Sequence, residues 1–354
     1  MYHQFFGLTK DPFSMTPDPA FLFLTAPHRE ALAGLTYAIL NRKGFVVLTG
    51  DAGTGKTTLL SRIFQSIPST RAKFSVVLNP TLTPSEFLEL ALLDFGVANI
   101  PTSKAQRLNL LQQFLIEAHR KNQVTVLVVD EAHKLAPDVL EEIRLLSNFE
   151  LAETKLLQIV LAGQTELGDM LNRQDLRQLK QRIAVRLAIH PLSAIGVQHY
   201  IQHRWQRAGS TEPHPFHTDA VALIAQYSRG IPRLVNAVCD NALTVAFAEG
   251  QKSIGTAHIV EVAGDLDLLD RPRPARRSVP NAPPVFHPKI GRTPNPVSAG
   301  NGRLNGAAVD GAPPPTLPTQ HGSQGNTSSV EQTSRLMRLA VKLGFPGKPG
   351  QVKS

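Results

Sequence analysis

The chain has 354 residues, of which 42% are hydrophobic and 18% are charged, as is ordinary for a soluble globular protein. No run reaches the roughly 18–20 apolar residues that span a bilayer, the start lacks a secretory-signal pattern, and the single cysteine, Cys239, excludes an intrachain disulfide. The net charge of +9 comes from the C-terminal part, because residues 1–270 hold 25 Lys and Arg against 26 Asp and Glu, and residues 271–354 hold 12 against 2. The remainder of the chain is therefore neutral overall.

Residues 1–192 alternate amphipathic helices with apolar runs rich in β-branched residues. The runs that predict strands are 45–49, 74–78, 124–129, 157–162 and 185–189. The stretches that predict helices are 28–42, 56–66, 84–95, 104–121, 137–149 and 173–181. Unbroken apolar strands separated by helices predict an α/β domain with a parallel sheet covered by helices on both faces.

The strand signals stop after this domain. Residues 193–268 contain four helical stretches, at 196–208, 218–228, 232–249 and 256–263, which predict a small all-helical domain. Cys239 lies in an apolar helical run there and is interpreted as a core residue.

The C-terminal tail has a different composition. Residues 269–328 are rich in proline and glycine and predict a disordered basic linker. A short basic amphipathic helix is expected at 329–344 and a disordered end at 345–354.

A phosphate-binding loop follows the first strand. The sequence GDAGTGKT satisfies G-x-x-x-x-G-K-[ST], with an apolar strand before it and a helix after it. Its backbone N–H groups and the helix N-terminus favour phosphate, Lys56 is expected to reach the β- and γ-phosphates, and the Thr57 hydroxyl to bind Mg²⁺. The residues expected to bind ATP here are Gly50, Asp51, Ala52, Gly53, Thr54, Gly55, Lys56, Thr57 and Thr58.

Two acidic residues end the strand at 124–129. Open α/β sheets bind ligands at this edge, so Asp130 is expected to hold the magnesium ion and Glu131 to orient or deprotonate the attacking water. The letters DEAH suggest a helicase, but no arginine-rich helicase segment is found, and we interpret His133 as a structural residue. An N-K-x-D guanine-reading motif and an LSGGQ signature are also absent.

Distal polar residues complete a recognisable pattern. Gln164 follows the strand LLQIVLAG, Arg182 and Arg186 lie in LKQRIAVRL, and Arg233 lies in GIPRLVN. Strand order and these positions resemble an AAA+ ATPase, a P-loop machine with a helical lid. The resemblance implies that Gln164 takes the sensor-1 place, Arg233 the sensor-2 place and Arg182 the place of an arginine finger acting in a neighbouring subunit. Arg186 competes for the finger role, and a surface salt bridge is the alternative for Arg182.

The N-terminal stretch FFGLTKDPFSMTPDPAFLFLTAPHREALAGLTYAI narrows the resemblance to ATPases of the general secretion pathway protein A, or ExeA, type, over about residues 1–268. The module also resembles transposition ATPases of the TniB and MuB kind. In this family class the lead-in wraps past the adenine, which places His28 and Arg29 near the base. The secretion protein carries a membrane-spanning helix and a peptidoglycan-binding region after its ATPase domain, whereas this sequence has a proline-rich basic tail.

Three functions are compatible with these features. The first is an ATP-hydrolysing, Mg²⁺-dependent switch in a homo-oligomer of the secretion type, acting on a client that the sequence does not identify. The second is a DNA-associated ATPase of the transposition-regulator type, whose basic tail binds DNA without sequence preference. The third is a module that binds ATP without turnover, which Glu131 and Arg182 argue against. We expect a cytoplasmic location, with peripheral contact between the tail and the acidic inner-membrane surface as an open alternative.

Overall fold

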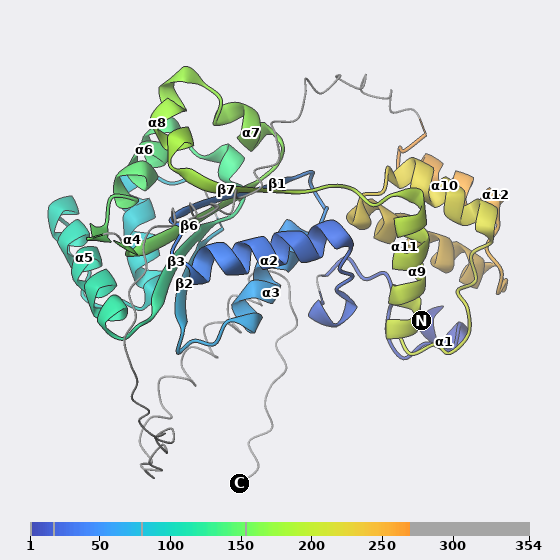
Figure 1. Cartoon of the computed structure of the whole chain (residues 1–354). Helices are drawn as coiled ribbons and strands as arrows, with labels where there is room; N and C mark the ends of the chain where they lie inside the picture. Colours follow the sequence, from blue (N-terminus) through green and yellow to red (C-terminus); the bar gives the residue numbers. More distant parts are fainter. Residues whose placement is uncertain (1, 17, 79–80, 153, 270–354) are drawn as a thin grey trace, which may run out of the picture. The chain divides into compact units, whose positions relative to one another are not determined.

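The computed structural model describes residues 2–16, 18–78, 81–152 and 154–269. A five-stranded sheet with the order β2-β3-β6-β1-β7 organises its first part, and every neighbouring pair is parallel (Figure 1). The strands are β1 (Phe45–Gly50), β2 (Ala72–Val77), β3 (Val124–Val129), β6 (Leu157–Gly163) and β7 (Ile183–Ile189). All five predicted strands are therefore present, and the predicted parallel α/β sheet is confirmed.

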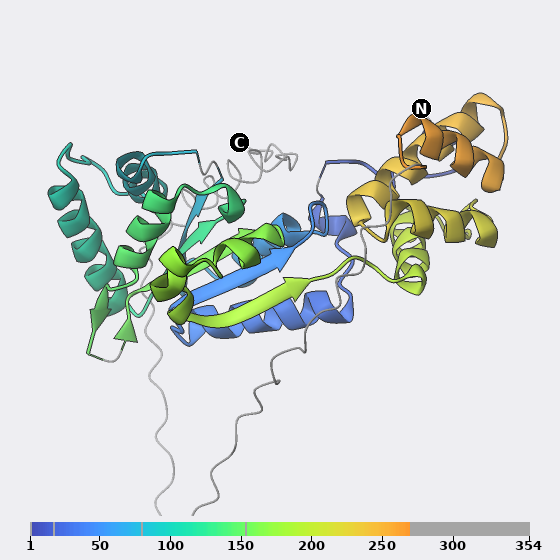
Figure 2. The same ribbon diagram turned by 90° about the horizontal axis from the view of Figure 1, so that it is seen from above.

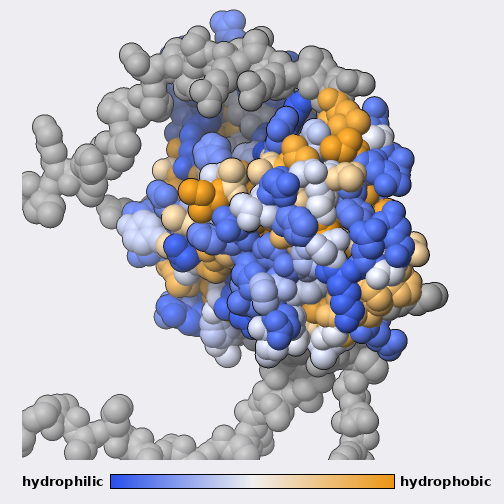
Figure 3. Space-filling model, turned by 90° about the vertical axis from the view of Figure 1, so that its right-hand side faces the viewer, coloured by the Kyte–Doolittle hydropathy of each residue, from blue (hydrophilic) through white to orange (hydrophobic). Residues whose placement is uncertain are grey.

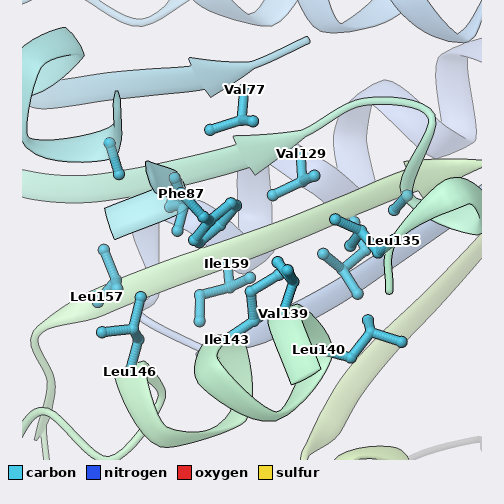
Figure 4. Close-up of a cluster of buried hydrophobic side chains, with 14 of the residues drawn as sticks. Val77, Phe87, Val129, Leu135, Val139, Leu140, Ile143, Leu146, Leu157 and Ile159 are labelled. Carbon is cyan, nitrogen blue, oxygen red and sulfur yellow. The ribbon is translucent and has the colours of Figure 1, made fainter. Parts of the chain in front are cut away.

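Helices cover both faces of the sheet (Figure 2). Helices α2 (Ala26–Leu40) and α3 (Lys56–Ser66) pack on one face, and α4 (Pro84–Phe95), α5 (Lys104–Arg120) and α6 (Pro137–Leu146) pack on the other. The alternation of strand side chains explains this arrangement, because Val126 and Val128 of β3 enter the first core and Leu127 and Val129 the second. Figure 4 shows the second core, where side chains of α6 meet those of the sheet.

Short elements connect β3 to β7. They are η2 (Ala132–Lys134), the hairpin of β4 (Glu150–Leu151) and β5 (Thr154–Lys155), α7 (Glu166–Met170), η3 (Gln174–Leu176) and α8 (Arg177–Gln181). The sequence predicts one helix over 173–181, whereas the structure has a 3-10 turn followed by a short α-helix. The sequence also does not predict the hairpin or α7.

Four helices form the second part of the chain, as predicted: α9 (Ala194–Arg207), α10 (Thr218–Ser228), α11 (Pro232–Ala248) and α12 (Thr256–Asp265). Their buried side chains form a core of their own, in which Cys239 is fully buried as expected.

The N-terminal lead-in shares that helical core. It contains α1 (Tyr2–Phe5) and η1 (Pro19–Phe21), and its side chains Leu8, Phe13 and Phe21 are buried among those of α9 to α12. The sequence groups this segment with the α/β domain, but its apolar residues pack with the helical one because α9 to α12 present the apolar surface that they cover.

Figure 3 shows one face of the helical part, where hydrophobic side chains form separate small groups among hydrophilic ones. Among the described residues, no helix is long and apolar enough to cross a membrane. The predictions for the linker at 269–328, the helix at 329–344 and the end at 345–354 concern residues that lie outside the described part, apart from Leu269.

Candidate functional site

The loop between β1 and α3 has the backbone that the glycine pattern predicts. Gly53 and Gly55 have positive φ angles of 81° and 100°, which side chains of L-residues rarely adopt. A Cβ atom on Gly50 would lie 2.6 Å from the carbonyl oxygen of Ile189, so this position also requires glycine. Gly55 is the N-cap of α3, and the free N–H groups of the first turn of that helix face the loop.

Lys56 is a buried cation at the start of α3. Its Nζ donates hydrogen bonds to the carbonyl oxygens of Gly50 at 2.7 Å and Asp51 at 3.0 Å. Within the described part of the chain, no carboxylate forms an ion pair with it. Burial lowers the pKa of Lys56, although Asp130, Glu131 and Asp51 act in the opposite direction. A buried ammonium group without an anionic partner fits an anionic ligand.

Thr57 and Asp130 bring the loop and the end of β3 together. The Thr57 hydroxyl donates a hydrogen bond of 2.7 Å to Oδ2 of Asp130, and the backbone N–H of Glu131 donates one of 2.9 Å to Oδ1. A hydroxyl and a carboxylate are oxygen ligands of the kind that Mg²⁺ prefers, and Mg²⁺ usually takes one or two carboxylates with phosphate and water. In the described ranges no group of three or more His, Cys, Asp or Glu residues is placed to hold a metal.

Glu131 has an unusual backbone. Its φ of 54° and ψ of 31° are left-handed, which is uncommon for a residue with a side chain and is found more often at functional sites. Its Oε2 lies 3.1 Å from Nζ of Lys134 and 3.7 Å from Nε2 of His133. Burial acts to raise the pKa of Glu131, but the hydrogen bond and charge of Lys134, with smaller contributions from His133 and Lys56, lower it on balance.

Gln164 lies directly after β6, beside η2. Its backbone N–H donates to Nδ1 of His133 at 3.3 Å, and its side-chain Nε2 lies 3.2 Å from Nε2 of His133. His133 therefore contacts both Gln164 and Glu131, although the sequence indicates only a structural role for it. The signal that could have found this is its position two residues after Glu131, but the contact depends on β3 and β6 being neighbours in the sheet.

Arg233 connects the helical part to the phosphate-binding loop. It lies in the first turn of α11, and its backbone N–H donates to the carbonyl oxygen of Gly53 at 3.3 Å. A Cβ atom on Gly53 would lie 2.7 Å from Cβ of Arg233, so the loop and the start of α11 approach as closely as a glycine allows. The sequence predicts Arg233 at the nucleotide, and the structure places it against the loop.

The predicted arginine fingers lie away from this site. Arg182 donates from Nη1 to the carbonyl oxygen of Arg144 and to the side chains of Ser147 and Asn148, at the end of α6. Arg186 is exposed on β7. Neither side chain lines the cavity described next.

A cavity of about 540 Å³ opens beside the loop. Residues Ala52–Thr58, Glu131, Gln164 and Arg233 line one part of it. The rest is lined by residues that the motifs do not mark, from the lead-in, α9 and α11, among them Phe21, Phe23, Tyr200, Arg204 and Asn236. Sequence reasoning misses these last three because they depend on how the helical part packs.

His28, expected near the base, also lines the cavity, whereas Arg29 donates to the carbonyl oxygen of Leu24 and does not line it. The His28 side chain is buried, with Nε2 3.1 Å from the carbonyl oxygen of Thr54 and Nδ1 2.6 Å from Oγ1 of Thr25. Burial lowers its pKa. His28 therefore connects the start of α2 to the phosphate-binding loop.

Comparisons with known proteins agree with this geometry. A family model described as an AAA domain matches residues 39–171. The chain contains an AAA domain and has the P-loop AAA+ fold. It resembles the general secretion pathway protein A of Aeromonas hydrophila, with 43% identity over 272 residues that cover 76% of this chain and 48% of that protein. The chain thus spans about half the length of this curated relative.

Solved structures show the same fold. The ORC2 protein of Aeropyrum pernix covers 73% of the chain with a TM-score of 0.55 and 18% identity, and the match covers 73% of that protein. Cdc6p of Pyrobaculum aerophilum covers 71% with a TM-score of 0.55 and 20% identity, over 72% of its own chain. At these identities the similarity concerns the fold alone.

Proposed function

We propose that this AAA+ protein binds ATP with Mg²⁺ at the loop of residues 50–58 and hydrolyses it. The observation that carries the proposal is the hydrogen bond of 2.7 Å between Thr57 and Asp130, because it joins the loop to the acidic end of β3. The buried, unneutralised ammonium group of Lys56 supports it, since a triphosphate would supply the missing negative charge.

Each residue then has a specific task. Bound MgATP supplies the γ-phosphoryl group that is transferred to water and a cation that neutralises charge on it. Lys56 donates N–H groups to phosphate oxygens, Thr57 and Asp130 hold the metal, and Glu131 accepts a proton of the attacking water at a carboxylate oxygen. Gln164 orients that water or a phosphate oxygen with its amide.

The contact between Arg233 and Gly53 supports a switch. Nucleotide phosphates at the loop would meet the first turn of α11, so nucleotide state and the position of the helical part are coupled in this proposal. We propose that the switch acts in a homo-oligomer of the secretion-pathway type, with Arg182 reaching a neighbouring site, and that the protein acts in the cytoplasm, including at the inner-membrane surface. The identity to a relative named for general secretion supports this setting.

A DNA-associated ATPase is the second candidate, because residues 271–354 hold 12 Lys and Arg against 2 Asp and Glu. ATP turnover measured with duplex DNA or with vesicles of anionic lipid, at low and moderate salt, separates the two. Stimulation by DNA that fades as salt rises supports the second candidate, whereas turnover that ignores DNA, with partition onto the vesicles, supports the first. A wild-type chain that releases no phosphate from ATP contradicts both.

A further inference from the structure

His133 lies behind the cavity rather than in it. The cavity is lined by Glu131 and Gln164, and His133 contacts both of them without lining it. Its side chain is only 11% exposed. The inference rests on the proposed ATPase function, which it extends by one residue.

The backbone brings His133 to this position in two ways. The left-handed conformation of Glu131 turns the chain at the end of β3, so that η2 folds back toward β6. Gly163 then allows a close approach, because a Cβ atom there would lie 3.2 Å from the backbone nitrogen of His133 and 2.9 Å from Cδ2 of Leu167. The position of this imidazole therefore depends on both the left-handed backbone of Glu131 and the missing side chain of Gly163.

The hydrogen bonds determine the tautomer of the ring. The backbone nitrogen of Gln164 always carries hydrogen and donates to Nδ1 of His133, so Nδ1 carries none. In the neutral ring the hydrogen is then on Nε2. The Nε2 atom that carries this hydrogen lies 3.2 Å from Nε2 of the Gln164 amide and 3.7 Å from Oε2 of Glu131.

The two neighbours compete for this hydrogen. An amide nitrogen only donates, so the Gln164 side chain accepts from Nε2–H when it turns to present its oxygen. When the amide is turned toward the cavity instead, Nε2–H is left to the carboxylate of Glu131. We propose that His133 is a positioning residue whose single Nε2–H couples the orientation of the Gln164 amide to the placement of the Glu131 carboxylate.

Three substitutions of His133 test this coupling. His133→Phe keeps a ring of similar size and removes both nitrogens, His133→Asn keeps an acceptor near Nδ1, and His133→Gln extends a donor toward the place of Nε2. We expect His133→Phe and His133→Asn to lower kcat for ATP by about tenfold to a hundredfold, with the Kd for ATP changed less than about twofold. His133→Gln should recover part of kcat. His199→Phe, on the exposed side of α9, is the matched control and should leave kcat unchanged.

A double-mutant cycle measures the coupling itself. In a Gln164→Ala background, His133→Phe should have a much smaller effect on kcat than it has in the wild type. If the effects of the two substitutions on kcat simply multiply, the proposal is overturned even though ATP turnover remains. A kcat of His133→Phe within about twofold of the wild type would overturn it as well.

A measurement without nucleotide gives an independent result. Nitrogen-15 NMR of the histidine side chains, with the signal of His133 assigned among 12 histidines by its loss in His133→Phe, reports the tautomer. The proposal expects hydrogen on Nε2, and hydrogen on Nδ1 would overturn it. If the wild type does not hydrolyse ATP, the proposed function fails, but this spectrum still tests whether Nδ1 of His133 accepts the hydrogen bond from the Gln164 backbone.

Discussion

Replacing Arg182 by alanine separates a structural role from a catalytic one. In the described chain, Nη1 of Arg182 donates to the carbonyl oxygen of Arg144 at 3.0 Å, to Oγ of Ser147 at 2.6 Å and to Oδ1 of Asn148 at 2.5 Å. These acceptors lie at the C-terminal end of α6, where a positive charge also complements the helix dipole. Arg182 therefore caps α6 of its own chain.

The size of the expected effect follows from these contacts. Nη1 has two hydrogens for three acceptors, and a hydrogen bond from a charged donor contributes about 1.5–3 kcal/mol when it is buried. Because the side chain is only partly buried, we expect Arg182→Ala to lower the free energy of unfolding by about 1–2 kcal/mol. For a protein of this size, Tm should fall by roughly 2–8 °C.

Thermal unfolding of the two arginine variants measures this effect. Arg186→Ala is the matched control, since the described residues give its exposed side chain no hydrogen-bond or ion-pair partner, and its unfolding free energy should change by less than about 0.5 kcal/mol. An unchanged Tm for Arg182→Ala would refute the capping role. A finger acting between subunits makes a separate prediction: turnover lost in Arg182→Ala should partly return on mixing with Lys56→Ala.

Three further predictions concern the site. Glu131→Gln should bind ATP normally and lower kcat by about a hundredfold or more, and an unchanged kcat in a phosphate-release assay would remove Glu131 from the mechanism. Burial lowers the pKa of His28 in the folded protein, so unfolding takes up a proton there below about pH 6.5. The free energy of unfolding should therefore decrease as the pH is lowered through that range. Urea unfolding of His28→Gln should show a shallower fall, and identical pH slopes for both proteins would contradict this. Gly53→Ala should lower the unfolding free energy by about 1–3 kcal/mol, because its φ of 81° and the close approach of Arg233 leave no room for a Cβ atom; a Tm equal to that of the wild type would be the opposing result.

The sheet and the polar residues at its carboxyl edge could be predicted because local signals and tertiary structure agree there. β3 and β6 are mostly apolar strands that are buried at every position, and each is followed by a polar residue, Asp130 or Gln164, at the same edge of the sheet. The hairpin of Glu150–Leu151 and Thr154–Lys155 escaped prediction because two-residue, partly exposed strands have no periodicity to detect.

The roles of single side chains were less predictable because they depend on which strands become neighbours. His133 meets Gln164, 31 positions later, only since β3 and β6 pair in the sheet. In the same way, Arg182 reaches the end of α6 because α8 packs beside it, and Phe13 joins the helical core because the lead-in covers α9 to α12. No pattern within either segment specifies those contacts.

Equilibrium binding of ATP to the purified chain, with and without Mg²⁺, tests the central claim most directly. The claim is that the loop carrying Lys56 and Thr57 and the carboxylates of Asp130 and Glu131 form one site for MgATP. Titration calorimetry should show binding that strengthens with Mg²⁺ in the wild type and is lost in Lys56→Ala, with the same far-ultraviolet circular dichroism for both proteins. A wild type that ignores ATP, or a folded Lys56→Ala variant that binds it equally well, would contradict the account.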